Sequence, residues 1–400
     1  MATASDRSIR RTPGGAGDIL ALFLRGEALT RNDLIAATGL ARSTVAQRLE
    51  ALLRAGYLTP DGENPSTGGR PANRFVFNAR AGYLLVAAIG ATHFTATLTA
   101  FDGDPLAERS GAVDIAEGPT SVLSAVRAAF RELVGEAGLA ANRVRGIGVS
   151  VPGPVEFASG RVVSPPIMTG WDGFDIPGWF ATDFDCPVLV DNDVNAMAYG
   201  EHTVSFPQHE HMLVIKVGTG IGCGIVMAGE LHRGAQGAAG DLGHVQAGLE
   251  WTNARGLLCR CGNVDCVEAY ASGWALVRDL RAAGYDVETG DDVVRLVRNG
   301  ETEAVSLMRR AGRIVGHAVA NAVSFFNPSL VVIGGQYARA DEPLLAGIRE
   351  VVYQRSLPLA TKHLQIAVSP LGAGAGVIGL SRLLAGHVLA PAAVDREIGG

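Results

Sequence analysis

One pattern constrains the fold of this chain more than any other: a short β-hairpin with a glycine-containing turn occurs twice. The first hairpin spans 84–101 around the turn Gly90-Ala91-Thr92-His93, and the second spans 211–228 around Gly218-Thr219-Gly220-Ile221-Gly222. Long amphipathic helices lie between short β-branched runs, which is typical of an α/β protein. The repetition predicts two related lobes that close on a cleft, with turns that can direct backbone N–H groups toward phosphate oxygens.

Length and composition indicate a globular protein with more than one domain. At 400 residues the chain exceeds what one hydrophobic core usually supports. It contains no run of about 18 apolar residues, and its first residues lack the apolar stretch of a signal peptide. We therefore expect a cytoplasmic protein that is not a membrane protein.

The charged residues are distributed unevenly. Residues 1–80 contain eleven Arg and seven Asp or Glu, a net charge of +4, which leaves −10 on the rest of a chain whose total is −6. A basic module on an acidic body favours a polyanionic partner for the first module only. A chance imbalance on a solvated surface would give the same numbers, so charge alone does not decide between the two interpretations.

The basic segment is predicted to form a helix-turn-helix. Apolar residues recur at helical spacing in 18–24, and Thr30 can cap a second helix over 31–38. A third helix is expected from residue 41 or 43 to about 55. Its polar side chains near the amino-terminal end or off the buried stripe can contact bases and phosphates in a major groove: Arg42, Ser43, Thr44, Gln47 and Arg48.

A wing is predicted to follow the third helix. Strands are expected at 56–59 and 74–77, and the loop 66–72 between them carries Gly69 and Arg70 at its tip. A flexible Gly-Gly followed by Arg suits insertion into a minor groove or contact with phosphates. Small helical bundles used for dimerisation share the helical periodicity, but the added wing favours binding of double-stranded DNA.

Four residues form a metal-ligand pattern. Cys259, Cys261 and Cys266 lie within eight positions of one another, and His244 precedes them. One imidazole and three thiolates make a closed tetrahedral set suited to structural Zn²⁺. Such a site contributes on the order of 10 kcal/mol to local folding. Three buried thiols that happen to lie close together are the alternative.

From about Leu84 to the last helix, the sequence resembles the ROK family (repressor, open reading frame, kinase) of sugar kinases and repressors, within the actin-like ATPase superfamily. The stretches that carry the resemblance are IGATHFTATLTAFDG, VSVPGPVEFASGRV, DNDVNAMAYGE, VGTGIGCGIVMAGELHRGAQGAAGDLGH, CRCGNVDCVEAYAS and NPSLVVIGG. The resemblance implies a two-lobed, ribonuclease H-like α/β domain and the same four zinc ligands. The winged module with its GGRP tip is similar to that of the family's repressor branch. The family has Gly where Asp265 stands, a departure that leaves the ligands unchanged.

These inferences define the expected domains. We predict a flexible amino terminus over 1–15, a winged helix-turn-helix over 16–80 and a ROK domain over 81–400. Lobe one is expected over about 81–195 together with the C-terminal helix from about 375, and lobe two, with the zinc site, over about 196–374.

A sugar site is predicted after the strand 188–190. Asn192 and Asp193 lie at the carboxyl end of that strand, where α/β folds place ligands, and a carboxylate beside an amide can hold two adjacent hydroxyls. A strand-end turn with side-chain hydrogen bonds is the alternative for this pair. The resemblance implies that Asp193 occupies the position of the general base in the family's kinases, and it adds sugar contacts from Gly153, Asp241, His244 and Glu268.

Two departures from the family bear on chemistry. Asp241 stands where the family usually has Glu, and its shorter side chain implies a different preferred sugar or a water-mediated contact. The first hairpin of the family's kinases begins Asp-x-Gly-Gly-Thr, whereas this chain has Ala88 at the Asp position. The glycine-rich residues that would approach a nucleotide are present: Gly218, Thr219, Gly220, Gly222, Gly334 and Gly335. Because tight turns need glycine regardless of ligand, we give the missing carboxylate more weight and expect neither use of ATP and Mg²⁺ nor catalysis.

The sequence thus predicts a sugar-responsive transcriptional regulator, most simply a repressor of carbohydrate metabolism genes. Its expected partners are a DNA operator, a monosaccharide effector and further copies of the chain in a homodimer or tetramer, with nucleoid association when it is bound to DNA. Glucose, xylose, N-acetylglucosamine and related sugars all fit the pattern. Two alternatives stay open: an ATP-dependent sugar kinase with a fused DNA-binding domain, in which Asp193 is the base, and a zinc-stabilised interaction protein that binds neither ligand.

Overall fold

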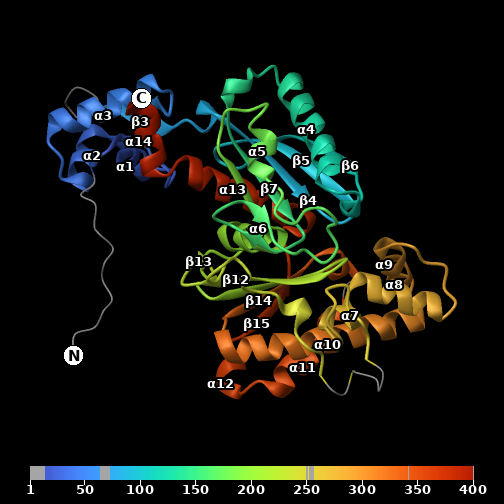
Figure 1. Cartoon of the computed structure of the whole chain (residues 1–400). Coiled ribbons are helices and arrows are strands. Elements are labelled where there is room, and N and C mark those ends of the chain that lie inside the picture. The colour runs from blue at the N-terminus through green and yellow to red at the C-terminus, as the bar shows by residue number, and fades with distance from the viewer. Residues whose placement is uncertain (1–13, 64–72, 249–250, 252–255, 341, 400) are drawn as a thin grey trace. The chain divides into compact units, whose positions relative to one another are not determined.

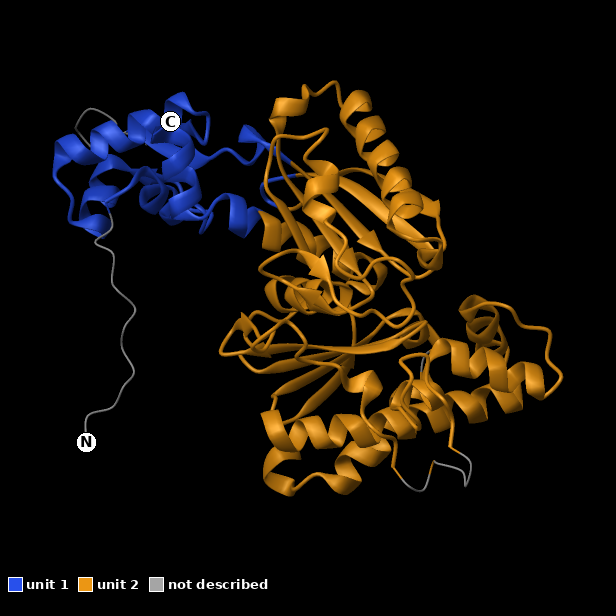
Figure 2. Cartoon of the chain, viewed as in Figure 1, with its two compact units in different colours: residues 1–83, 100–102, 385–400 blue, residues 84–99, 103–384 orange. Residues whose placement is uncertain are grey.

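The chain divides into two units, which Figure 2 shows in different colours. Unit 1 comprises residues 1–83, 100–102 and 385–400, and unit 2 comprises residues 84–99 and 103–384. The computed structural model describes residues 14–63, 73–248, 251, 256–340 and 342–399. Most of the predicted amino-terminal segment 1–15 lies outside the described residues, as do Gly69 and Arg70 of the predicted wing.

Unit 1 combines a helix-turn-helix with a small antiparallel sheet. Its elements in chain order are α1 (Ala16–Phe23), β1 (Leu29–Thr30), α2 (Arg31–Thr38), α3 (Arg42–Arg54), β2 (Leu58–Glu63), β3 (Asn73–Phe77) and α14 (Pro391–Gly399). The strand order is β1-β3-β2, with both pairs antiparallel. The strands come close to the expected positions, although β2 begins at Leu58 rather than at residue 56.

Local sequence explains where α2 begins and ends. The Thr30 hydroxyl accepts a hydrogen bond from the Asp33 N–H at 3.3 Å, and the Asp33 carboxylate accepts one from the Thr30 N–H at 2.7 Å. The Thr30 N–H and the Thr30 hydroxyl both donate to the Asp33 carboxylate, and these two hydrogen bonds lower the pKa of the Asp33 carboxyl below its usual value. Gly39 ends the helix in the left-handed region, at a φ of +70°.

The last helix, α14, belongs to unit 1, whereas the helix that we expected from about residue 375 is a separate one, α13 (Ala375–Val388), whose residues 375–384 belong to unit 2. Residues 385–400 group with the helix-turn-helix, and α14 packs on α1. The Gly17 N–H donates to the Asp395 carboxylate at 2.9 Å, and the Tyr57 hydroxyl donates to Glu397 at 2.7 Å. Gly17 allows this approach, because a side chain there would collide with the backbone of Pro391. These contacts join residues more than 300 positions apart, beyond the reach of local pattern.

Unit 2 contains two five-stranded sheets (Figure 1). We call the part with the first sheet lobe one and the part with the second sheet lobe two. The first sheet has the order β10-β7-β4-β5-β6, from β4 (Tyr83–Ile89), β5 (His93–Ala100), β6 (Pro105–Ala112), β7 (Val144–Val151) and β10 (Val188–Asn192). The second has the order β13-β12-β11-β14-β15, from β11 (Met212–Val217), β12 (Ile221–Met227), β13 (Glu230–Leu231), β14 (Leu330–Gly334) and β15 (Gln365–Val368). Two short strands, β8 (Val155–Glu156) and β9 (Arg161–Val162), pair separately.

The two sheets follow one plan. In each, three strands consecutive in the chain form one side, and two later strands extend the sheet from the first of the three. The later strands are parallel to their neighbours, as in the pairs β7–β10, β11–β14 and β14–β15. The predicted repeat of a hairpin is therefore a repeat of a whole sheet. Ile221 and Gly222, which we placed in the second turn, belong to β12.

Two helices connect the lobes through glycine contacts. In Figure 1, α6 (Asp193–Gly200) lies between the two sheets, and α13 (Ala375–Val388) runs beside it. A Cβ on Gly379 would stand 1.8 Å from the backbone oxygen of Ala196, so the two helix backbones touch only because glycine is present. Met197 and Ala198 of α6 pack against the second sheet. This position places the first residue of α6, Asp193, between the lobes.

The remaining α-helices belong to unit 2. They are α4 (Pro119–Glu136), α5 (Ile176–Phe180), α7 (Val267–Ala271), α8 (Gly273–Ala282), α9 (Gly290–Arg298), α10 (Thr302–Phe326), α11 (Glu342–Arg355) and α12 (Pro358–Thr361). Among the described residues, no single helix is long and apolar enough to cross a membrane, and one bent pair, Gly372–Val388 with Pro391–Gly399, passes that test by length and composition only.

Candidate functional site

A cleft of about 1820 Å³ opens between the two lobes of unit 2. Both glycine-containing turns line it, together with the end of β10 and the beginning of α6. The lining includes every residue that we predicted for the sugar and for a nucleotide: Gly153, Asn192, Asp193, Asp241, His244, Glu268, Gly218, Thr219, Gly220, Gly222, Gly334 and Gly335. The cleft therefore gathers residues that are as far as 182 positions apart in the chain.

Ala88 and Lys216 occupy equivalent positions in the two repeats. Each is the second-last residue of the first strand of its hairpin, β4 or β11, and each precedes the turn glycine by two positions. The last six residues of both strands share one burial pattern, in which only this position is half-buried and the other five are buried. Both residues line the cleft. The side chain at this position therefore sets what each hairpin offers to a ligand.

Asp193 forms an ion pair with Lys216. The Lys216 ammonium donates to the Asp193 carboxylate, and the two side chains retain exposures of 32% and 16%. Asp193 comes from α6 and Lys216 from β11, so the pair joins elements 23 positions apart. The carboxylate has a second oxygen and faces the cleft, where it can accept a hydrogen bond from a ligand hydroxyl.

Asn192 is already engaged within the protein. Its amide oxygen accepts from the Val194 N–H at 2.9 Å and caps α6, and its amide nitrogen donates to the Gly153 carbonyl at 2.9 Å. This is the strand-end arrangement that the sequence left as an alternative. These two contacts leave one N–H and one lone pair of the amide for a ligand, and Asn192 lines the cleft with Asp193.

Glu268 supports the second glycine turn. Its carboxylate accepts from the Ile221 N–H at 3.0 Å, and the side chain is only 7% exposed. Gly220 makes room for it, because a Cβ there would lie 2.7 Å from a carboxylate oxygen. Asp241 is different, since it is exposed and its carboxylate has no hydrogen bond or ion pair among the described residues. It is the carboxylate of the predicted sugar set that is open to solvent.

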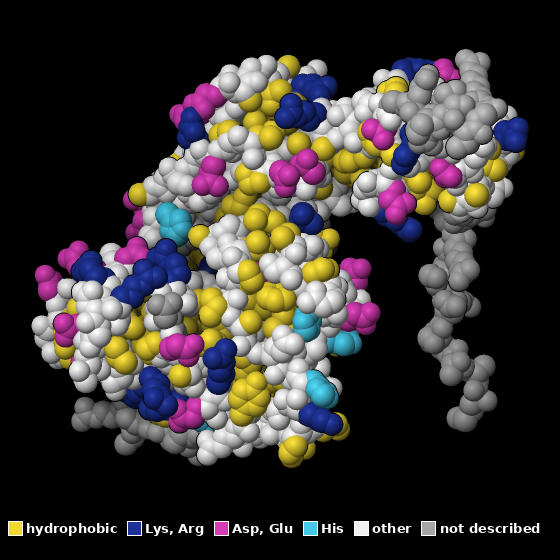
Figure 3. Space-filling view, turned by 180° about the vertical axis from the view of Figure 1, so that it is seen from behind, with side chains coloured by type: hydrophobic (Ala, Val, Ile, Leu, Met, Phe, Trp, Pro, Cys, Tyr) yellow, Lys and Arg dark blue, Asp and Glu magenta, His cyan; other side chains and the backbone are white. Residues whose placement is uncertain are grey.

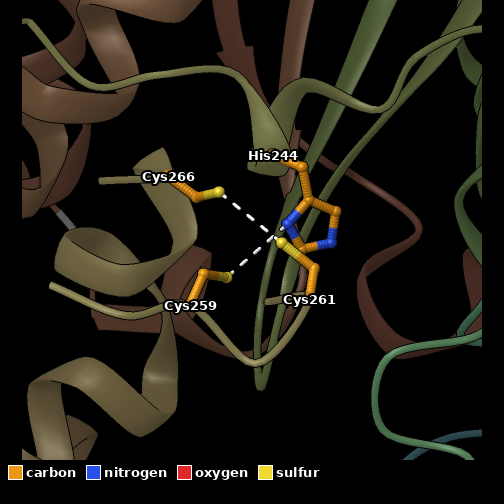
Figure 4. Close-up of side chains that lie close together, drawn as sticks. All are labelled: His244, Cys259, Cys261 and Cys266. Atoms are coloured by element: carbon orange, nitrogen blue, oxygen red, sulfur yellow. Dashed lines mark hydrogen bonds between the residues drawn. The ribbon is translucent and has the colours of Figure 1, made fainter. Parts of the chain in front are cut away.

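Four side chains converge on a candidate metal centre in lobe two. One ligand atom from each of His244, Cys259, Cys261 and Cys266 lies within 4.8 Å of the others. Figure 4 shows the three thiols and the imidazole pointing toward one another, with Cys259 Sγ 3.7 Å from His244 Nδ1 and Cys261 Sγ 3.6 Å from Cys266 Sγ. Burial raises the pKa of the Cys259 and Cys266 thiols. A cation bound among them would favour the thiolate forms.

A second ion pair joins the lobes beside Asn192. Arg233 donates to Asp191 from Nε at 3.0 Å and from Nη2 at 2.6 Å, and its guanidinium lies 3.8 Å from the ring centroid of Phe157. Asp191 is buried at the end of β10 in lobe one, whereas Arg233 follows β13 in lobe two. The pair fixes the end of β10, which carries the predicted sugar residues.

The predicted DNA-contacting side chains lie on α3. Arg42, Ser43 and Gln47 are exposed, and Thr44 is half-buried. Arg48 donates from Nε to the Gly14 carbonyl at 3.2 Å, so its guanidinium also contributes to the structure of unit 1.

Sequence reasoning missed the roles of Lys216 and Arg233. Lys216 carried a signal that we did not use, because it and Lys362 are the only lysines among 34 basic residues. A lysine in an arginine-rich chain suggests a position that needs an amine. Arg233 had no such signal, since nothing local connects it with Asp191.

Comparison with known proteins gives two family matches. The model of the ROK family matches residues 85–387, and that of the IclR helix-turn-helix domain matches residues 16–62. The xylose repressor of Caldicellulosiruptor bescii is 28% identical over 385 residues, which cover 93% of this chain and 95% of that protein.

Solved structures also resemble the chain, and two of them are informative here. A ROK family transcriptional regulator, a homologue of the E. coli MLC protein, gives a TM-score of 0.79 at 24% identity and covers 96% of this chain and 98% of its own. This likeness concerns the fold. A ROK family glucokinase from Streptomyces griseus, in complex with glucose and AMPPNP, gives a TM-score of 0.66 at 29% identity and covers 76% of this chain and 99% of its own.

Proposed function

Because the chain belongs to the ROK family, we propose that it is a sugar-responsive, DNA-binding transcriptional repressor. One observation carries the proposal: a helix-turn-helix and a ligand cleft occur in the same chain. Polar residues are exposed at the start of α3, and Asp193 lines the cleft. Ala88 stands in this cleft at the position where the family's kinases have an aspartate. The similarity to a xylose repressor over 93% of the chain supports it.

The cleft residues suit the hydroxyl groups of a sugar. Asp193 and Asp241 offer carboxylate oxygens to sugar hydroxyls, and Asn192 offers its remaining N–H and lone pair. His244 and Glu268 connect the site to the metal centre and to the second turn. A sugar held by both lobes would bind their closed arrangement more tightly than an open one, which is the differential affinity that a ligand-driven switch requires.

We propose that this closure regulates DNA binding in a homodimer or tetramer. Dimeric helix-turn-helix proteins contact half-sites about one helical turn apart, so a small change in the separation of two modules alters operator affinity. Zn²⁺ bound by His244, Cys259, Cys261 and Cys266 would hold lobe two in its folded form, because three thiolates and one imidazole are the ligand set of structural zinc.

Phosphoryl transfer to the sugar is not part of the proposal. Transfer requires the nucleotide phosphates and Mg²⁺ to be fixed in line with an acceptor whose proton a base removes. Ala88 offers no carboxylate to the metal, and the Asp193 carboxylate is ion-paired with Lys216. We expect no sugar phosphate when the protein is incubated with glucose, xylose or N-acetylglucosamine and Mg-ATP, measured by a coupled assay for ADP.

The DNA-binding half is tested with variants of α3. Arg42→Ala should weaken binding to a duplex that the wild-type protein selects from a random library by about 1–3 kcal/mol, if Arg42 contacts a base. Arg54→Ala is the matched control, because Arg54 lies at the other end of α3 and pairs with Glu50 on the surface. Equal affinity of both variants and the wild type would remove α3 from the interface.

The sugar-sensing half is tested with Asp193→Ala. Operator binding by this variant should persist, while its response to any sugar that releases the wild-type protein from DNA should disappear. Asp286→Ala removes an exposed carboxylate outside the cleft and should respond as the wild type does. A variant Asp193→Ala that responds at the wild-type sugar concentration would place the effector site elsewhere.

A further inference from the structure

We propose that the effector of this cleft is an anionic monosaccharide, with a phosphate ester or a carboxylate on the carbon that faces the second turn, and that Lys216 recognises this group. The inference rests on the proposed function as a sugar sensor, and it adds the chemical class of the sugar. Neither the family match nor the related proteins assigns a role to Lys216.

The position of Lys216 is the first argument. The two repeats share their strand order, and the last six residues of β4 and β11 share one burial pattern. The half-buried position in this pattern holds Ala88 in the first repeat and Lys216 in the second, so the two repeats differ in charge at the cleft. Ala88 contributes none, and Lys216 contributes one positive charge. A carboxylate at position 88, which would be expected in a site for a metal-nucleotide complex, is absent. The cleft instead has a fixed cation at the equivalent position of the other repeat.

The choice of lysine is the second argument. Of 34 basic residues, only Lys216 and Lys362 are lysines, so an amine occurs here against the strong preference of the chain for arginine. An ammonium is a compact charge with three donors, whereas a guanidinium is a broad planar fork. One donor of Lys216 goes to Asp193, and two donors can serve a ligand. This geometry lets one side chain hold a protein carboxylate and a ligand anion together.

Charge balance is the third argument. A phosphate or carboxylate placed near Asp193 alone would be repelled, because two like charges at contact distance disfavour each other. Lys216 neutralises Asp193 and removes this penalty. Within the described residues, the backbone N–H groups of Thr219 and Gly220 form no hydrogen bond, and both residues line the cleft. They are additional donors for anionic oxygens in the same turn.

The wider cleft does not supply the same recognition. Arginines occur on its lobe-two side, and Figure 3 shows Lys and Arg side chains gathered over the part of unit 2 formed by α8 and α9. Arg281 donates to the Val287 carbonyl, Arg298 donates to the Arg339 carbonyl, and Arg339 pairs with Asp291. Arg278 pairs with Asp279, and Arg260 lies over the Trp274 ring at 4.9 Å. Lys216 is the cation in contact with Asp193, where the sugar is expected.

The experiment compares neutral sugars with anionic counterparts by isothermal titration calorimetry on the full, metal-loaded chain. The probes are glucose, glucose 6-phosphate and glucuronate; xylose and xylose 5-phosphate; and N-acetylglucosamine and its 6-phosphate. We expect at least one anionic sugar to bind about tenfold to hundredfold more tightly than its neutral parent, as charge-assisted hydrogen bonds predict. Glucuronate against glucose 6-phosphate then distinguishes a carboxylate from a phosphate ester.

Variants connect the preference to Lys216. Lys216→Met should reduce the preference to about twofold or less, and Lys216→Gln, which can still donate to Asp193, should do the same if the first variant unfolds. Lys362 is the other lysine of the chain and does not line the cleft, so Lys362→Met should keep the full preference for the anionic sugar. Tighter binding of neutral sugars, or a preference that survives loss of Lys216, would overturn the inference and leave the sugar sensor intact. Absence of binding by every probe would overturn the sensor function as well.

Discussion

The hairpins β4–β5 and β11–β12 start from one plan and end with different chemistry. Both begin with a strand whose last six residues are buried in the same pattern, and both turn beside the cleft through glycine. The first turn is held by backbone hydrogen bonds: the Gly90 N–H donates to the His93 carbonyl at 2.8 Å, and the N–H groups of Val113 and Ile115 donate to the Thr92 and Ala91 carbonyls at 3.0 and 2.9 Å. In the second hairpin, Lys216 pairs with Asp193 and the Glu268 carboxylate accepts a hydrogen bond from the Ile221 N–H. Glu268 follows Cys266 by two positions, so the same segment also carries part of the metal cluster.

This difference teaches that the backbone of the repeat fixes where a ligand group can lie, whereas single side chains decide which ligand group is accepted. A duplicated fold provides two equivalent positions at the cleft. At these positions the first repeat has Ala88 and the second has Lys216, so the two repeats differ in charge although their strand order and burial pattern are the same. The comparison therefore makes predictions that should affect one repeat and spare the other.

Metal removal should have the largest effect, and it should be confined to the second repeat. Structural zinc of this ligand set contributes on the order of 10 kcal/mol to local folding. We expect one zinc per chain by elemental analysis, and a chelator should increase hydrogen exchange in β11, β12 and α7 while β4 and β5 stay protected. Equal loss of protection in both hairpins would contradict the asymmetry. Protons compete for the thiolates, so zinc occupancy should fall as pH falls.

Replacement of Glu268 should have an intermediate effect. Glu268→Ala leaves the Ile221 N–H buried without its acceptor, a loss that costs about 1–3 kcal/mol of the free energy of unfolding. Glu230→Ala, on the exposed edge strand β13, is the matched control and should change stability by no more than about 0.5 kcal/mol. Urea unfolding of the two variants measures the difference. If Glu268→Ala is as stable as the control, the second turn does not depend on this carboxylate.

Local pattern was sufficient for much of this architecture. The helix predicted over 31–38 is α2, since Thr30 and Gly39 mark its ends through contacts within four residues. The two hairpins follow from β-branched runs and turn glycines in the same way. The contacts that distinguish the two repeats did not follow, because Lys216–Asp193 and Glu268–Ile221 join elements distant in the chain. The same limit explains the position of α14 on α1.

Among the functional residues, too, local spacing predicted some roles and left others undecided. The spacing of the three cysteines predicted a ligand set, and the structure brings those residues together with His244. The amide of Asn192 could not be assigned from sequence, because a sugar contact and a helix cap require the same residue at the same strand end. In the structure it caps α6 and contacts Gly153. Its contribution to a sugar therefore stays a prediction that depends on the remaining N–H and lone pair.

Restoring a carboxylate to the first repeat should have the smallest effect, and it is the most direct test of the comparison. Ala88→Asp places a negative charge at the half-buried position equivalent to Lys216, so it should weaken binding of an anionic sugar about threefold to tenfold through like-charge repulsion in a partly solvated cleft. Ala88→Asn has nearly the same size without the charge and should bind as the wild type does. Calorimetry with the preferred anionic sugar measures both variants. Because Lys216 still pairs with Asp193 in Ala88→Asp, the variant should form no sugar phosphate from Mg-ATP; turnover would show that the carboxylate at position 88 alone separated this cleft from a kinase.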